Sequence, residues 1–249
     1  MAGAAMGATT KTDTYIITFG SNGGGKLETQ TTASSLTYNL ISTPGNSGYI
    51  GSSLTATDGL TTSVFGFDTR GNLSGSGGQI TNGFSGDVTG INTVFQGAPI
   101  LGSITKDGGF KFTNAEAGSY TIYALAARGN TYSNSNTTYN QYLLNGIDTA
   151  SASIVSYNVS QGVNAPSLNP DGTIITALSD GRNKTATDWV LMKFEFELSE
   201  TTDIWVDNRG GNSNFAGFVV EHTYSIPEPT TATLSLLALA GLAARRRRK

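Results

Sequence analysis

The sequence has no cysteine, only one histidine and few charged residues, which are 13% of its 249 positions. Without cysteine, disulfides, thiolate metal ligands and thiol nucleophiles are excluded. Protein zinc sites combine several His, Cys or carboxylate ligands, so the single His222 argues against such a site. We therefore expect no metal and no cofactor.

Positive charge is also scarce outside the end of the chain. The sequence carries 15 Lys and Arg against 18 Asp and Glu, a net charge of −3. The last five residues are all cations, and without them ten cations face the same 18 acids, a balance of −8. Nucleic-acid binding requires basic patches that contact phosphates. The composition therefore argues against a nucleic-acid partner.

Glycine, serine, threonine and asparagine are abundant and separate short runs rich in β-branched and aromatic residues. This pattern is typical of strands joined by turns. It predicts strands at 14–20, 36–41, 60–67, 109–112, 119–127, 141–144, 152–159, 172–177, 190–198, 203–206 and 216–222, with further short strands near Ile80 and at 92–95. No helical period persists before residue 230. We therefore predict an all-β protein, an antiparallel β-sandwich.

Two of these runs indicate where a core lies. Residues 119–127 are apolar on both faces, which predicts a central strand. Residues 190–198 alternate, so that Val190 and every second residue after it face one way, while Lys193, Glu195 and Glu197 face the other. One face of this strand is expected to be buried and the other solvated.

Three segments, GSYTIYALAARGN at 118–130, NPDGTII at 169–175 and FAGFVVE at 215–221, resemble in their strand-and-turn rhythm the galactose-binding-like jelly rolls of secreted bacterial proteins. The resemblance implies a jelly-roll sandwich with sugar binding. Residues 207–211 are expected to form a turn directly after Trp205, which would gather polar side chains beside an aromatic platform. The alternative is that both tryptophans fill the core. The candidate sugar-binding residues are Arg128, Asn130, Trp205, Asn208 and Arg209.

The end of the chain joins a rigid break, an apolar run and a cationic block. Pro227, Glu228 and Pro229 form the break, because proline lacks a backbone N–H and disfavours helix in the residue before it. Residues 230–244 carry no charge and are rich in the helix formers Leu and Ala. We assign this run as a membrane-crossing helix through Thr230, Leu234, Leu236, Leu237, Leu239, Gly241, Leu242 and Ala244. The cationic block is Arg245, Arg246, Arg247, Arg248 and Lys249.

This apolar helix is short for a membrane span. Its 15 residues extend roughly 22 Å at ~1.5 Å per residue, whereas a bilayer core is about 30 Å thick. Snorkelling arginines lengthen its reach. The cations should stay in the cytoplasm and leave everything before Pro227 outside. A short, charge-stopped span suits a transient, cleavable membrane anchor, and a permanent tail anchor is the alternative.

Together, these three parts resemble the PEP-CTERM sorting signal of Gram-negative bacteria. The resemblance covers 226–249 and implies export, a transient hold in the inner membrane, and processing near 227–229 by an exosortase, a membrane cysteine peptidase. It also implies delivery to the cell surface, outer envelope or extracellular matrix, where proteins with this signal are often associated with exopolysaccharide. A glycan partner is thereby implied as well.

Catalytic chemistry finds little support elsewhere. A Ser-His-Asp triad would have to use His222, and no Gly-x-Ser-x-Gly elbow accompanies it. Glu195 and Glu197 share a strand face about 7 Å apart, as a glycosidase carboxylate pair would, but Lys193 beside them favours a solvated face.

These observations divide the chain into three parts. Residues 1–10 are interpreted as the remnant of a signal peptide, or a disordered start. Residues 11–224 form the sandwich ectodomain, and residues 225–249 form the sorting and anchor segment. We predict an exported, non-enzymatic surface or matrix protein with a structural or adhesive ectodomain. The alternatives are a carbohydrate-binding module and, after it, a glycoside hydrolase.

Overall fold

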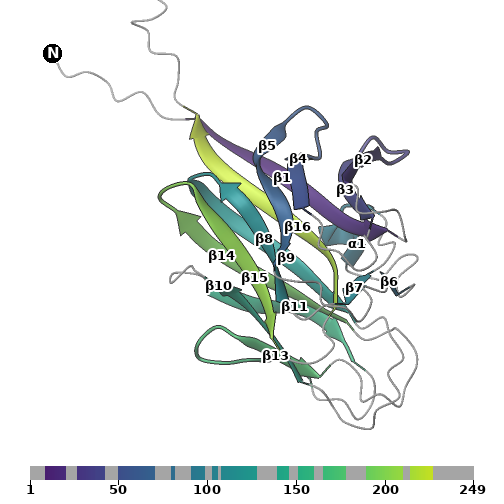
Figure 1. Ribbon diagram of the computed structural model, residues 1–249, viewed down its shortest axis with the longest axis vertical. Helices are drawn as coiled ribbons and strands as arrows, with labels where there is room; N and C mark the ends of the chain where they lie inside the picture. Colours follow the sequence, from purple (N-terminus) through teal and green to yellow (C-terminus); the bar gives the residue numbers. More distant parts are fainter. Residues whose placement is uncertain are drawn as a thin grey trace, which may run out of the picture.

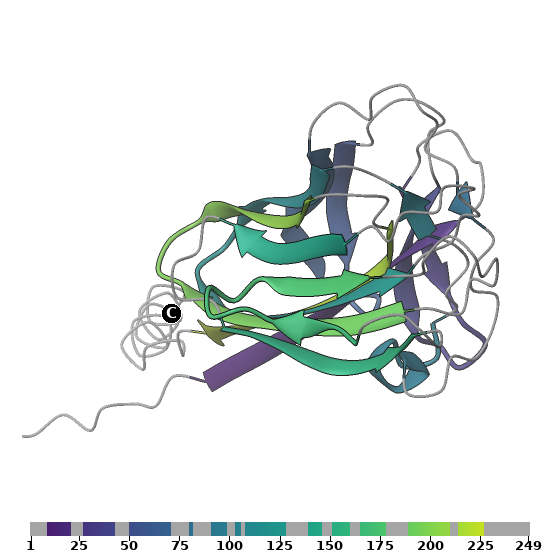
Figure 2. The ribbon, with the colours of Figure 1, turned by 90° about the horizontal axis from the view of Figure 1, so that it is seen from below.

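The computed structural model describes residues 9–20, 27–42, 50–70, 80–81, 91–98, 103–105, 108–127, 139–145, 151–159, 165–177, 189–209 and 214–226. These residues form two β-sheets packed face to face, together with one short helix, α1 (Ile91–Val94) (Figures 1 and 2). The predicted all-β sandwich is therefore confirmed.

Sheet A contains the first and last strands of the described chain. Its order is β11 (Ser151–Asn158), β14 (Trp189–Leu198), β9 (Gly118–Ala127), β16 (Asn214–Ile226), β1 (Thr9–Gly20), β3 (Thr37–Ser42) and β2 (Leu27–Thr31). The short strands β7 (Ser103–Thr105) and β6 (Ile80–Thr81) continue from the start of β16. Neighbouring strands are antiparallel except β1 and β3, which run parallel. As predicted, the strand formed by 119–127 is central, between β14 and β16.

Sheet B has the order β12 (Ser167–Leu168), β13 (Ile174–Ala177), β10 (Tyr139–Asn145), β15 (Thr202–Arg209), β8 (Gly108–Ala115), β5 (Thr62–Arg70) and β4 (Ile50–Thr55). From β8 onward the chain changes sheet at almost every connection. The jelly-roll assignment remains a prediction.

The other predictions about helices and strands agree with the structure only in part. A strand was expected at 92–95, and this is wrong, because Ile91–Val94 is the helix α1. Strands β2, β4, β7 and β12 were not predicted. The expected helix at 230–244 lies outside the described residues. Within the described ranges, no helix has both the length and the apolar character needed to cross a bilayer.

The main core lies between the two sheets. The inner-facing residues of β14 expected from the alternation, Val190, Met192, Phe194, Phe196 and Leu198, are all buried there. Sheet B contributes Phe112, Ile204 and Val206 from its central strands. Edge-to-face ring contacts at about 6 Å join Phe218 to Phe112 and to Phe19, an arrangement that aromatic quadrupoles favour.

Asn39 fastens the two sheets to each other inside this core. Its fully buried amide Nδ2 donates to the carbonyl of Ile16 at 3.1 Å and to that of Thr55 at 2.8 Å. Its Oδ1 accepts from the Thr55 N–H at 2.9 Å. Because buried polar groups are costly unless satisfied, this side chain fixes β3 of sheet A against β4 of sheet B.

A second core covers part of the outer face of sheet A. Ile91, Phe95 and Ala98 of the α1 segment are buried against apolar side chains of this face, among them Ile16, Tyr38, Leu125, Trp189, Leu191 and Val219. The Phe95 ring lies so close to Gly217 that a Cβ there would be 2.8 Å from it. The absence of a side chain at 217 therefore lets the α1 segment sit directly on β16.

We expect Phe95→Ala to destabilise the fold by about 3–5 kcal/mol, the usual cost of removing a fully buried Phe side chain. The matched control is Thr93→Ala, an exposed position in α1, two residues before Phe95, which should change stability by less than about 0.5 kcal/mol. Urea unfolding of both variants measures the difference. Equal stabilities would show that the α1 segment is not part of the core.

Candidate functional site

The first and last strands of the sandwich lie side by side and bring the start and end of the described chain together (Figure 1). The β1–β16 ladder runs in register from Thr18 opposite Gly217 to Thr9 opposite Ile226. Both strands extend two residues beyond the predicted bounds 11–224. The ladder therefore reaches the residue directly before Pro227. We call this end of the molecule, where β1 begins and β16 ends, the exit end.

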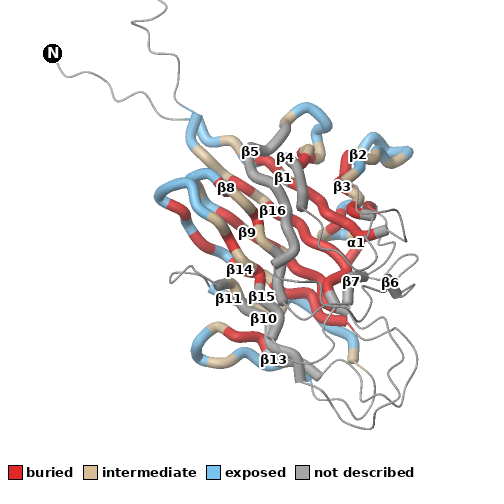
Figure 3. Tube along the Cα trace, viewed as in Figure 1, coloured by how far each residue is buried: buried red, intermediate tan, exposed pale blue. Residues whose placement is uncertain are grey.

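The last residues of β16 are paired on one side only. Strand β9 accompanies β16 as far as Ser119 opposite Thr223. Among the described strands, Tyr224, Ser225 and Ile226 pair with β1 alone. Residues in the middle of both strands are buried, whereas Ser225 and Ile226 at the end of β16 are exposed (Figure 3). The exit end is thus a half-open edge in the middle of a sheet.

Gly118 is the reason that β9 leaves β16 at this point. Its φ of +146° is a conformation that side-chain-bearing residues rarely adopt. A Cβ at 118 would also lie 2.6 Å from both the Thr223 carbonyl oxygen and the His222 Nε2. Only glycine allows the β8–β9 turn to pass this close to β16 and then turn away.

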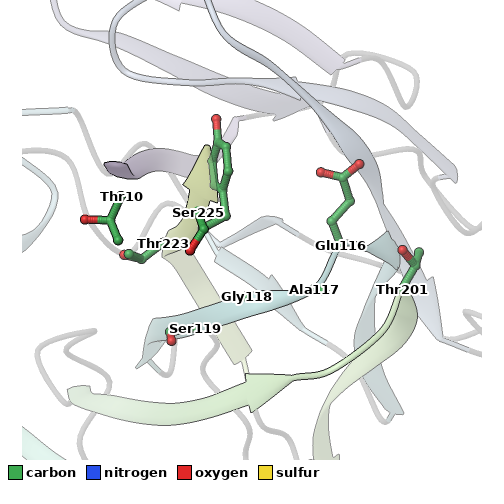
Figure 4. Close-up of a pocket in the computed structure, with 9 residues that line it drawn as sticks. Thr10, Glu116, Ala117, Gly118, Ser119, Thr201, Thr223 and Ser225 are labelled. Atoms are coloured by element: carbon green, nitrogen blue, oxygen red, sulfur yellow. The ribbon is translucent and has the colours of Figure 1, made fainter. Parts of the chain in front are cut away.

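An open hollow of about 640 Å³ lies beside the half-open edge. Its walls are residues 116–119 of the β8–β9 turn, Thr201 of the β14–β15 turn, Thr10 of β1 and residues 223–225 of β16. Figure 4 shows Glu116 and Thr201 on one side of the hollow and Thr10, Thr223 and Ser225 on the other. Hydroxyl groups dominate the described part of the lining, to which Glu116 contributes a carboxylate.

Behind the hollow, a row of rings crosses three strands of sheet A. The Tyr120 ring stacks on Phe196 at 5.3 Å and on His222 at 4.4 Å between centroids. Because a carbonyl oxygen can only accept, the 3.1 Å contact between His222 Nε2 and the Ala117 oxygen assigns the ring proton to Nε2. The histidine is buried and holds the β8–β9 turn in place, a structural role.

A buried carboxylate, Asp13, ties the exit end together. Its two oxygens accept from the Tyr224 hydroxyl at 2.9 Å and from Lys11 Nζ at 2.8 Å. Lys11 also donates to Thr61 Oγ1 at 3.0 Å, which reaches the β4–β5 turn. The hydrogen bond to Asp13 raises the pKa of Lys11. Burial, and then Asp13, raise the pKa of Tyr224. We call Lys11, Asp13 and Tyr224 the clasp.

The carboxylate pair considered for glycosidase chemistry lies on the outer face of sheet A. Glu195 and Glu197 are both exposed. Lys193 Nζ pairs with Glu195 at 2.9 Å, and Ser119 Oγ donates to Glu197 at 3.2 Å. The expectation of a solvated strand face is confirmed for these residues.

The sugar-binding candidates are described only in part. Trp205 lies half-buried on β15, and Lys111 Nζ stands 5.1 Å from its ring centroid, a cation–π distance. The expected turn at 207–211 is wrong for its first three residues, because β15 continues to Arg209, with Asn208 opposite Tyr142 and Arg209 opposite Gln141. Arg128 and Asn130 lie outside the described residues. Grouping these residues into one site remains a prediction.

Sequence reasoning missed the clasp and the hollow. Lys11 and Asp13 precede the strand predicted at 14–20, and Tyr224 follows the one predicted at 216–222. The available signal was the alternation of both segments, which places Asp13 and His222 on the same face once the strands pair. That pairing joins residues more than 200 positions apart and has no local signal.

The family model of the PEP-CTERM protein-sorting motif matches residues 225–249, which begin with the last two residues of β16. The resemblance found in the sequence is therefore confirmed. No curated protein and no solved structure matches the chain. The motif supports a secreted surface protein that an exosortase-type enzyme processes.

The buried ring row predicts alkaline sensitivity. Burial raises the pKa of Tyr120 above its ordinary value of 10.0, so above that pH the unfolded chain loses a proton that the folded chain keeps. Stability is therefore full below pH 10 and falls as the pH rises toward the folded pKa, by up to about 1.4 kcal/mol per pH unit for each such tyrosine. Tyr120→Phe should flatten the decline by that amount.

Urea unfolding between pH 9 and pH 11 measures these slopes. Identical slopes for the wild type and Tyr120→Phe would contradict a raised pKa of Tyr120 in the folded protein.

Proposed function

We propose that this chain is a non-enzymatic component of the cell surface or extracellular matrix. Residues 11–224 form its structural or adhesive ectodomain, and residues 225–249 form its sorting and anchoring segment. The observation that carries the proposal is the PEP-CTERM match, which begins inside the last strand of the sandwich. The segment that directs sorting is therefore joined to the folded body without an intervening linker.

The tail acts in three steps in this proposal. The apolar run at 230–244 halts export in the inner membrane, and the cations at 245–249 hold the chain end in the cytoplasm. Pro227, Glu228 and Pro229 then present a non-helical segment outside the membrane. An exosortase-type enzyme cleaves near this segment and releases the sandwich toward the cell surface.

A structural or adhesive role is supported by what the reactive side chains do. Asp13 and His222 are buried and are engaged in holding strands and turns together. Glu195 and Glu197 are exposed on a sheet face, where Lys193 and Ser119 contact them. Each of these groups has a folding or solvation role that accounts for its position.

The first test is the mass of the mature protein. We expect chains recovered from the native envelope to end near 227–229 and to lack every peptide from 245–249. Replacing Pro227, Glu228 and Pro229 together with alanine should leave the full-length chain in the inner membrane. A matched triple replacement of Thr230, Thr231 and Thr233 with alanine should be processed like the wild type. Mass spectrometry of the C-terminal peptides reports each outcome, and an intact Lys249 on wild-type protein would establish a permanent anchor instead.

Carbohydrate binding is the second candidate, and Trp205 with its neighbouring cation favours it. Aromatic faces beside polar groups are a common sugar-binding arrangement, and exopolysaccharide is the implied ligand. This candidate predicts that Trp205→Ala abolishes retardation of the ectodomain in polysaccharide affinity gels. Tyr157→Ala, which removes an exposed ring from β11 in the other sheet, should have no effect. Equal mobility of all three proteins with and without polysaccharide would exclude it.

A further inference from the structure

We propose that the hollow at the exit end is the surface on which the processing peptidase docks, and that the peptidase adds an extended segment of its own to the half-open edge of β16. This inference rests on the proposed processing near 227–229. It assigns a partner to the hollow lined by the described residues of the exit end.

The edge itself is the first support. Alternate residues of an extended strand direct their N–H and C=O groups to opposite edges. Among the described strands, Tyr224, Ser225 and Ile226 pair with β1 on one side only. At least one of them therefore directs these groups toward the side that β9 has left. Exposed strand edges are templates for an added strand from a partner.

The position of the hollow identifies which partner this is. Ser225 lines the hollow and stands two residues before Pro227, about 7 Å along an extended chain. An enzyme whose active site holds 227–229 is many times larger than this distance, so its surface must cover the exit end while it acts. The hollow is the recess that such an enzyme meets directly upstream of its cleavage segment.

The lining fits an extended polar segment. Thr10 and Thr201 bring hydroxyls that both donate and accept, and Glu116 brings an exposed acceptor. Ser119 Oγ already donates to Glu197 and adds a further acceptor. Backbone groups of an added strand, with a cationic or amide side chain opposite Glu116, satisfy this set. An apolar helix would leave these groups without partners, which is costly when water is excluded.

The edge is also held ready for pairing. The clasp fixes Tyr224 through Asp13, and Thr12 Oγ1 meets Thr223 Oγ1 at 2.7 Å across the same ladder. A partner therefore finds the strand already extended and does not have to order it. Pre-organisation of this kind lowers the entropic cost of binding.

The test fills the hollow and measures processing of the full chain in its native membrane. Thr201→Trp places a large ring in the hollow from an exposed turn position. The matched control, Ser199→Trp, places the same ring on the same turn outside the lining. Pulse-chase labelling should show processing slowed by about tenfold or more for Thr201→Trp, as expected when a docking centre is blocked, and a wild-type rate for Ser199→Trp.

A second pair of variants tests the carboxylate without adding bulk. Glu116→Lys should slow processing by about tenfold because it replaces the negative charge of the described lining with a positive one. Glu200→Lys, an exposed change on the neighbouring turn that alters the net charge equally, should not. The thermal midpoints of all four purified ectodomains should agree with that of the wild type within about 3 °C, which separates blocked docking from misfolding.

The outcomes distinguish this inference from the function on which it rests. If the wild type is not processed, the proposed function fails and the docking surface fails with it. If the wild type is processed while Thr201→Trp and Glu116→Lys match their controls, the function stands and the docking surface is wrong. A wild-type processing rate together with altered dimer mass or vesicle flotation for Thr201→Trp would assign the hollow to a second copy or to lipid headgroups and would likewise overturn the inference.

Discussion

The pairing of β1 with β16 is the constraint on which the rest of the structure depends. These strands come from opposite ends of the sandwich and pair along Thr9–Thr18 and Gly217–Ile226. Because β16 also pairs with β9, the ladder joins the N-terminal strands β1, β3 and β2 to the C-terminal half of sheet A. Without it, Phe19 and Phe218 would not meet in the inner core, and the clasp would have no second strand to hold.

The same ladder explains why both faces of sheet A are used. One face of β16 supplies Phe218 and Val220 to the core between the sheets. On the other face Val219 lies beneath the α1 segment, and Gly217 admits the Phe95 ring. Toward the exit end this outer face turns polar, with Glu221 and Thr223. A single strand therefore passes from a doubly buried position to a half-open edge within ten residues.

Local patterns in the sequence predicted the sorting signal and most of the strands, although β2, β4, β7 and β12 were missed. The alternation of 190–198 and the apolar run at 119–127 predicted two central strands. A strand buried on one face alternates apolar and polar residues, and a strand buried on both faces is apolar throughout. The α1 segment was missed because one helical turn is too short to show a period. The clasp and the hollow were missed because they depend on register between distant strands. The prediction of a turn at 207–211 was wrong for its first three residues, because pairing with β10 and β8 extends β15 to Arg209.

The position of the sorting signal has a consequence for the order of folding and processing. Sheet A cannot close until β16 has been exported and pairs with β1, and pairings between such distant strands form slowly. A transient anchor directly after Ile226 would hold the chain outside while this happens. The half-open edge exists only when β16 is paired with β1 and when Gly118 has turned β9 away. A peptidase that docks on that edge would therefore release folded chains in preference to unfolded ones, and release would be coupled to completion of the fold.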